Sequence, residues 1–161
     1  MGTAALGGTF DGIHRGHLAL IGRALEISDG IIIGLASDVL AKRRGKAPTM
    51  PYEERLEGLR RAVDSEFPGA TYEIARLDDI FGPAVLDGRV DALVVSEETA
   101  GAGDDLNRLR ATRGVRPVRV VVVPMVAAED GSPISSTRIR AREVDAEGRL
   151  TGGGANVEPG A

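Results

Sequence analysis

The chain has 161 residues, of which 42% are hydrophobic and 27% charged, and its formal net charge is −4. These values are ordinary for a globular domain, and one domain is the simplest expectation at this length. An acidic chain lacks the overall basic footprint of a nucleic-acid-binding protein. Cysteine is absent from the sequence, which excludes disulfides, thiolate metal sites and a cysteine nucleophile and is compatible with a reducing compartment.

The apolar runs of the sequence are short. The longest, Gly30–Ala36 and Val118–Val123, are too short to cross a bilayer. The N-terminus shows neither the basic region nor the cleavage-like site of a signal peptide. We therefore expect a cytoplasmic enzyme or binding domain without a membrane or nucleic-acid partner.

The first third of the chain predicts a strand, a helix and a second strand. Thr3–Leu6 is short and apolar, ends at a glycine pair and is predicted to be a central strand. Apolar residues then recur at helical spacing, at Leu18, Ile21 and Leu25. The unbroken apolar run Gly30–Ala36 indicates a strand that is buried on both faces of a parallel sheet.

The next segments continue this alternation. A basic loop, Lys42–Lys46, precedes Pro51, which suits the first position of a helix. The helix is predicted over Tyr52–Ser65, with an apolar stripe formed by Leu56, Leu59 and Val63.

The second half predicts three further strands and two helices. The strands are Ala70–Leu77, Val90–Val95 and Val118–Val123. Asp104–Arg113 is predicted to be a helix that turns Leu106 and Leu109 inward, and a last helix is predicted to begin within Ile134–Arg140.

This order predicts an α/β fold, a Rossmann-like doubly wound sheet of about five parallel strands with right-handed crossovers. Residues 1–147 are expected to form the domain, and the glycine-rich tail 148–161 is expected to be disordered. In such sheets ligands bind beyond the carboxyl ends of the strands, at the point where the strand order reverses.

Both histidines of the chain, His14 and His17, lie in the stretch Gly7–His17 that joins the first strand to the first helix. They are one helical turn apart and share a face. Unpaired N–H groups and the positive end of the helix dipole lie at the same place. The pattern predicts a polyphosphate site.

The other residues of this stretch fit the same prediction. Gly7 and Gly8 let the backbone approach a ligand closely, and Thr9 offers a hydroxyl and an N–H. Asp11 is placed to cap the following turn. Gly16 lacks a Cβ where a phosphate or sugar must come close.

Two alternatives remain for the histidines. They can simply cap the helix or lie on its surface. They can also ligate zinc, but the sequence has no third histidine and no cysteine, so the other ligands would have to be carboxylates alone.

Three other groups of residues suggest chemistry, and each has a plainer interpretation. The first group is Ser135, Ser136, Thr137 and Arg138, whose hydroxyls and guanidinium can bind phosphate oxygens at a helix start; the plainer interpretation is an N-cap followed by a solvated basic face. The second is Lys42–Lys46 with Pro51–Arg55, which can form a cationic segment that folds over an anionic substrate; the plainer interpretation is a solvated loop. The third is the pair Glu97 and Glu98, which can bind a ribose, an amine or hydrated Mg²⁺; the plainer interpretation is a pair of acidic residues in the first turn of a helix.

The sequence Gly-Thr-Phe-Asp-x-x-His-x-Gly-His, paired with Ile-Ser-Ser-Thr-Arg-Ile-Arg near the C-terminus, resembles the nucleotidyltransferase superfamily of adenylyl- and cytidylyltransferases. Within it, the chain resembles the archaeal-type phosphopantetheine adenylyltransferases. The likeness covers roughly residues 3–145. Its other supporting stretches are Pro51–Leu56, Leu77–Asp79, Gly82–Ala84, Val94–Thr99 and Val121–Arg140.

The resemblance implies transfer of AMP from ATP to 4′-phosphopantetheine, which gives dephospho-coenzyme A and pyrophosphate, with Mg²⁺ accompanying ATP. It implies that His14 and His17 are the catalytic residues. The residues it implies for ATP binding are Gly8, Thr9, Phe10, His14, His17, Ser135, Ser136, Thr137 and Arg138. Those implied for the acceptor are Thr9, Asp11 and Lys42, and no residue is assigned to a metal.

The chain departs from the bacterial enzymes of this family in two places. Where those have an arginine-rich segment after the fourth strand, this chain has Ser96–Thr99. They also use a lysine after the second strand, for which Lys42 is the nearest match, with Lys46 and the neighbouring arginines as competitors. Other acceptors therefore stay open, namely riboflavin phosphate, nicotinamide mononucleotide and glycerol phosphate, as does a nucleotide-binding regulator without catalysis.

Overall fold

The structure is a computed structural model that describes residues 2–45, 47–79, 81–82 and 88–124. The predicted phosphate-binding residues Ser135, Ser136, Thr137 and Arg138 lie outside these ranges, as do the last predicted helix and the tail from residue 148. Lys46 of the basic segment also lies outside them.

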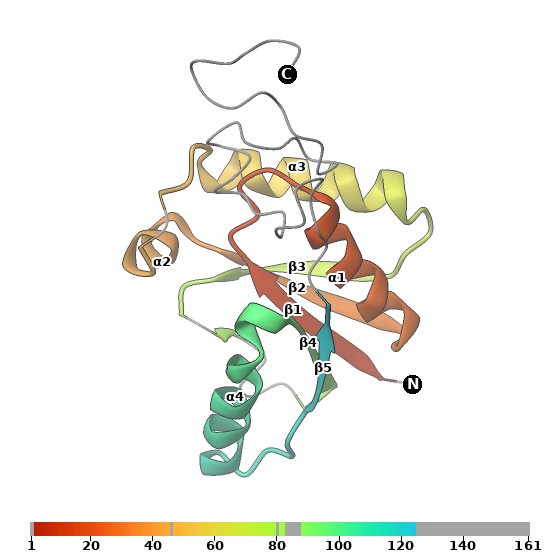
Figure 1. The fold of residues 1–161 in the computed structure, drawn as a ribbon, viewed down its shortest axis with the longest axis vertical. Helices are drawn as coiled ribbons and strands as arrows, with labels where there is room; N and C mark the ends of the chain where they lie inside the picture. The colour runs from red at the N-terminus through yellow and green to blue at the C-terminus, as the bar shows by residue number, and fades with distance from the viewer. Residues whose placement is uncertain (1, 46, 80, 83–87, 125–161) are drawn as a thin grey trace.

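A five-stranded sheet with every neighbouring pair parallel forms the centre of the molecule (Figure 1). Its order is β3-β2-β1-β4-β5. The strands are β1 (Thr3–Gly8), β2 (Gly30–Ala36), β3 (Tyr72–Leu77), β4 (Val90–Ser96) and β5 (Arg119–Val123). The predicted doubly wound α/β fold is confirmed, with β1 at the centre.

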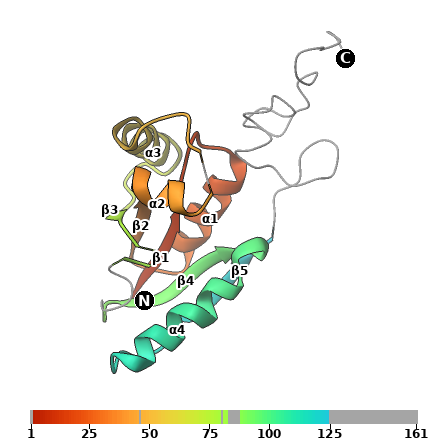
Figure 2. The ribbon, with the colours of Figure 1, turned by 90° about the vertical axis from the view of Figure 1, so that its left-hand side faces the viewer.

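Four α-helices are described, and they cover both faces of the sheet (Figures 1 and 2). They are α1 (Arg15–Glu26), α2 (Asp38–Arg43), α3 (Tyr52–Glu66) and α4 (Gly101–Thr112), and a single 3₁₀ turn, η2 (Glu97–Thr99), follows β4. None of the helices within the described ranges has the length and apolar character needed to cross a membrane.

The two faces of the sheet are buried in separate apolar clusters because neighbouring residues of a strand point to opposite sides. Leu6 and Ile33 pack with residues of α1 and α3, whereas Ala5 and Ile32 pack with Leu106 of α4. Because both faces of β2 are covered, Gly30–Ala36 is an unbroken apolar run.

Apart from small shifts at the ends of several elements, the described elements differ from the predicted ones in four respects. β1 continues through the glycine pair to Gly8. Lys42 and Arg43 belong to the end of α2, a helix that was not predicted, so the basic segment begins as a helix. Pro51 is the N-cap of α3, one residue before its first helical position.

The fourth difference concerns α4. Leu106 is fully buried as predicted, but Leu109 is 41% exposed and the prediction for it was wrong. The inward position one turn after Leu106 belongs to Arg110, which is 1% exposed. Arg110 is held by the carbonyl oxygens of Arg116 and Val90, at 2.6 and 3.0 Å.

The strand order reverses between β1 and β4. β1 pairs with β2 along its whole length, from Thr3 to Gly8. Its described pairing with β4 covers only Thr3–Ala5 and contains a register shift. The carboxyl half of β1 therefore leaves β4 at the position where doubly wound sheets bind ligands.

Candidate active site

His14 and His17 form a reciprocal cap at the start of α1. The Nδ1 atom of His14 accepts hydrogen bonds from the backbone N–H groups of Gly16 and His17, at 3.0 and 3.4 Å. In return, the Nδ1 atom of His17 accepts from the backbone N–H of His14 at 3.2 Å. This is a capping box built from two imidazoles in place of the usual serine and glutamate.

The cap determines where each ring carries its proton. A ring nitrogen that accepts a hydrogen bond is unprotonated, so a neutral imidazole with Nδ1 as acceptor has its proton on Nε2. Both histidines therefore keep an Nε2–H donor on the side of the ring away from the backbone amides. The capping interpretation and the phosphate-binding interpretation of these residues are compatible, because each uses a different nitrogen.

Both imidazoles are held in the neutral form. Burial lowers the pKa of His14 to about 4, and burial followed by repulsion from His14 lowers that of His17 to about 3. The two rings are stacked, with centroids 3.7 Å apart and planes 18° from parallel. Stacked rings at this distance disfavour a second positive charge, so the site presents neutral donors at neutral pH.

Phe10 supports this stack from the loop before α1. Its ring centroid is 4.9 Å from that of His17, and Phe10 is 2% exposed. Its φ of +50° is the single positive value for a non-glycine residue within the described ranges. A left-handed conformation costs a bulky residue about 1–3 kcal/mol and is kept only where the surroundings impose it.

The glycines of this loop make room for these rings. A Cβ on Gly16 would lie 2.8 Å from Cε1 and 3.0 Å from Nδ1 of His14, and one on Gly8 would lie 3.2 Å from the ring of Phe10. Gly16 was expected to lack a Cβ because a ligand comes close there; in the structure the space is taken by His14. The backbone N–H groups of Gly16 and His17 are likewise used by His14, so the expectation that they are free for phosphate is corrected.

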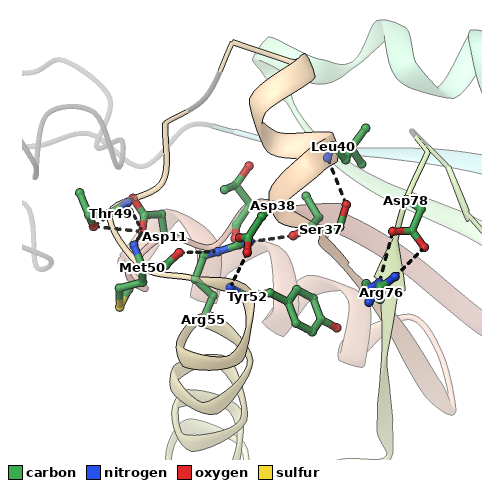
Figure 3. A network of polar contacts seen from close by, with 12 residues as sticks. Asp11, Ser37, Asp38, Leu40, Thr49, Met50, Tyr52, Arg55, Arg76 and Asp78 are labelled. Carbon is green, nitrogen blue, oxygen red and sulfur yellow. Dashed lines mark hydrogen bonds and ion pairs between the residues drawn. The ribbon is translucent and has the colours of Figure 1, made fainter.

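Asp11 does not cap α1, because His14 is the N-cap. Asp11 is 7% exposed. Its carboxylate accepts hydrogen bonds from the backbone N–H of Thr49 at 2.9 Å and from that of Met50 at 3.1 Å (Figure 3). The Thr49 hydroxyl also donates to it, at 3.2 Å. Asp11 therefore joins the loop after β1 to the segment before α3, and its predicted contact with the acceptor stays a prediction.

Arg55 was grouped in the sequence analysis with the cationic segment, and the structure buries it. It is 1% exposed, on the side of α3 that also carries Leu59 and Val63. Its guanidinium donates to the carbonyl oxygens of Thr9 and Ala36 and to the carboxylate of Asp38. The one sequence signal for this role is a charged residue on an apolar stripe, four residues before Leu59.

The remaining candidates are exposed. Lys42, Arg43 and Arg44 lie at the end of α2, beyond the carboxyl end of β2. Glu97 and Glu98 lie in the η2 turn, beyond the carboxyl end of β4. Histidine, aspartate and glutamate side chains form no group of three or more suited to a metal ion within the described ranges.

Comparison with known proteins places the chain in a family. The cytidylyltransferase-like family model matches residues 5–142. A phosphopantetheine adenylyltransferase of Methanopyrus kandleri is 41% identical over 87% of this chain and 88% of its own length. One from Methanosarcina acetivorans is 42% identical over 93% and 96% of the two chains.

Solved structures agree on the fold. A protein of unknown function from Archaeoglobus fulgidus superposes with a TM-score of 0.68 at 32% identity, over 75% of this chain and 88% of that one. A lipopolysaccharide core biosynthesis protein from Thermoplasma volcanium, at 21% identity and a TM-score of 0.62, covers 76% and 96% of the two chains and shows the fold alone. The chain therefore belongs to the cytidylyltransferase-like family and, within it, to the archaeal-type phosphopantetheine adenylyltransferases.

Proposed function

We propose that the protein transfers AMP from ATP to 4′-phosphopantetheine, giving dephospho-coenzyme A and pyrophosphate. One observation carries the proposal: two neutral Nε2–H donors, fixed by their own backbone at the head of α1, lie beyond the central strand. Relatives at about 40% identity over most of the chain bear the name of this enzyme.

The reaction needs no nucleophile from the protein. A phosphate oxygen of the acceptor forms a bond to the α-phosphorus of ATP, and the bond from that phosphorus to the bridging oxygen breaks on the opposite side. The electron pair of the broken bond leaves with pyrophosphate. Catalysis then consists of positioning the two substrates and stabilising the charge that develops on the transferred phosphoryl group.

His17 is the donor proposed for an α-phosphate oxygen, and His14 and Arg138 are proposed for the β- and γ-phosphates. Because the Nε2–H donors are neutral, they strengthen as charge develops without first forming a tight ion pair with the substrate. Loss of one such preorganised donor typically reduces the rate by about 10²–10³-fold. The hydroxyls of Ser135–Thr137 are also proposed to hold the triphosphate, as the family resemblance implies.

Gly8, Thr9 and Phe10 are proposed to line the nucleotide side of the site, since they form the end of β1 and the start of the loop that follows it. Lys42 is proposed to meet the acceptor phosphate, with Thr9 and Asp11 beside it. Mg²⁺ is proposed to arrive with ATP, held by phosphate oxygens and water, as is usual for this cation at nucleotide sites.

The decisive assay is release of pyrophosphate by the purified protein. ATP and CTP are each supplied with phosphopantetheine, riboflavin phosphate, nicotinamide mononucleotide or glycerol phosphate. We expect turnover with ATP and phosphopantetheine to exceed every other pair. A preference for another acceptor or for CTP would reassign the enzyme within its family, and tight nucleotide binding without pyrophosphate release in any pair would identify a regulator.

The role of His17 is tested with His17→Ala. This variant should keep the circular dichroism spectrum of the fold and lose about 10²–10³-fold in turnover. A folded His17→Ala protein with wild-type turnover would contradict the assignment of His17 as the donor.

A further inference from the structure

The buried guanidinium of Arg55 connects three segments of the chain that meet at the carboxyl edge of the sheet (Figure 3). Nη1 donates to the carbonyl oxygens of Thr9 and Ala36, both at 2.8 Å, and Nε donates to that of Met50 at 3.0 Å. Nη2 donates to the carboxylate of Asp38 at 2.6 Å. Four acceptors at these distances fix the position of each segment relative to the others.

A second connection runs parallel to the first. Thr49 and Met50 donate their backbone N–H groups to Asp11, while the carbonyl oxygen of Met50 accepts from Arg55. The loop after β1 is thus attached to the start of α3 at two points, the carbonyl of Thr9 and the carboxylate of Asp11.

These two points flank Phe10. The residue between them has the left-handed backbone conformation and packs its ring against that of His17. Such a conformation is kept only where the surroundings impose it, and the anchors on either side hold the two ends of this residue. Arg55 is thus connected to the His17 ring through Thr9 and Phe10.

The same guanidinium also fixes the start of α2. Ala36 is the last residue of β2 and Asp38 the first residue of α2, the helix that carries Lys42 at its other end. The Asp38 side chain is 56% exposed, and the Arg55 hydrogen bond is the main reason that its pKa lies below the ordinary value. Arg55 is the group common to the segment expected to hold ATP and to the segment expected to hold the acceptor.

We propose that Arg55 is a positioning residue for the transfer. Without touching either substrate, it fixes the position of the loop that packs Phe10 against His17 relative to the helix that contains Lys42. The proposal rests on the proposed function. A buried charge is a weak source of stability, because apolar side chains of the same volume often stabilise a fold equally well. Four directed hydrogen bonds from one rigid fork do, however, define geometry in a way that an apolar side chain does not.

The test compares two identical substitutions at the two buried arginines. Arg55→Lys keeps the charge but replaces the planar fork by a single point of donation. Arg110→Lys makes the same change at a side chain that is also 1% exposed and also bound to backbone carbonyls, but that joins α4 to the beginning of β4. Both variants are expected to lose thermal stability.

Only Arg55→Lys is expected to lose activity. A displacement of reacting groups by about 1 Å reduces rates by about 10²-fold, and the loss should fall on kcat with little change in KM, because the donors are needed most in the transition state. Wild-type kcat in folded Arg55→Lys, or an equal loss of kcat in Arg110→Lys, would overturn the proposal.

A second readout, the NMR signals of the imidazoles, does not depend on turnover. Because the chain has only two histidines, each imidazole can be observed separately. In protein labelled with ¹⁵N-histidine, long-range correlation spectra should show two imidazoles, each with a protonated Nε2. Arg55→Lys should shift or broaden the signals of His17, and Arg110→Lys should leave them unchanged. This comparison keeps its meaning even if the wild-type protein has another substrate. Unchanged histidine signals in Arg55→Lys would count against the link through Phe10.

Asp38→Ala decides the matter if Arg55→Lys fails to fold. The Asp38 side chain is more than half exposed, so the change opens no buried cavity, and it removes the carboxylate that accepts from Nη2 of Arg55. A smaller loss of kcat with a shift in the His17 signals supports the proposal. Wild-type values for both would overturn it.

Discussion

Gly16 lies between the two histidines, and its replacement by alanine separates the stability of α1 from the geometry of the site. The added Cβ would lie 2.8 Å from Cε1 and 3.0 Å from Nδ1 of His14. The distance to Cε1 is shorter than Cβ contacts allow and that to Nδ1 is tight, so the His14 ring must shift. The ring would then lose its two backbone donors and its stacking contact with His17.

The effects on stability nearly cancel. Alanine is favoured over glycine in a helix by up to about 1 kcal/mol, whereas loss of a side-chain N-cap costs about 1 kcal/mol. We therefore expect a change of less than about 1 kcal/mol in the free energy of unfolding, or about 2–4 °C in Tm for a chain of this size. Turnover should nevertheless fall by about 10²–10³-fold, because a preorganised donor is misplaced.

Gly58→Ala provides the matched control. Gly58 lies within α3, and an added Cβ there would contact nothing within 4 Å. It should raise stability by about 0.5–1 kcal/mol and leave turnover unchanged. Thermal melts and pyrophosphate release are measured on both variants. Wild-type turnover in Gly16→Ala would refute the argument that the glycine exists to admit the His14 ring, and a large fall in Tm would refute the cancellation.

Three further outcomes are expected. First, the free energy of unfolding should decrease as the pH falls below 6.5, by up to about 1.4 kcal/mol per pH unit for each proton. The unfolded chain binds protons there while folded His14 and His17 stay neutral down to about pH 4 and 3; urea titrations of the wild type and of the His14→Asn/His17→Asn variant should differ in this slope, and equal slopes would contradict the pKa values. Second, His14→Asn should keep the wild-type Tm and lose turnover, because its amide oxygen replaces the Nδ1 acceptor but not the Nε2–H donor. His14→Gln should have a lower Tm and keep part of the turnover. The reverse pattern would contradict the assigned roles of the two nitrogens. Third, Leu106→Ala should destabilise by about 2–5 kcal/mol, while Leu109→Gln should stay within about 0.5 kcal/mol of the wild type in denaturant unfolding; similar losses for the two would show that Leu109 is buried after all.

Sequence patterns predicted the elements that are fixed by burial. Gly30–Ala36 was predicted with the bounds that β2 has, because a strand covered on both faces has a run of apolar residues of its own length. The short helix α2 was missed, although Ser37 followed by Asp38 is an N-cap with an acidic first turn, and Ser37 does accept from Leu40. Leu109 was misplaced because an apolar residue was preferred to Arg110 for an inward position.

The fold class and the pair of imidazoles at the head of α1 follow from the sequence, because alternation of burial and a local capping pattern depend on residues close together in the chain. The contacts that anchor the loop before this pair arise from the tertiary fold. Asp11 and Thr49 are 38 residues apart, and Arg55 reaches Thr9 across 46. Contacts at such separations depend on how strands and helices pack, and no local pattern records which carbonyl a buried guanidinium will meet.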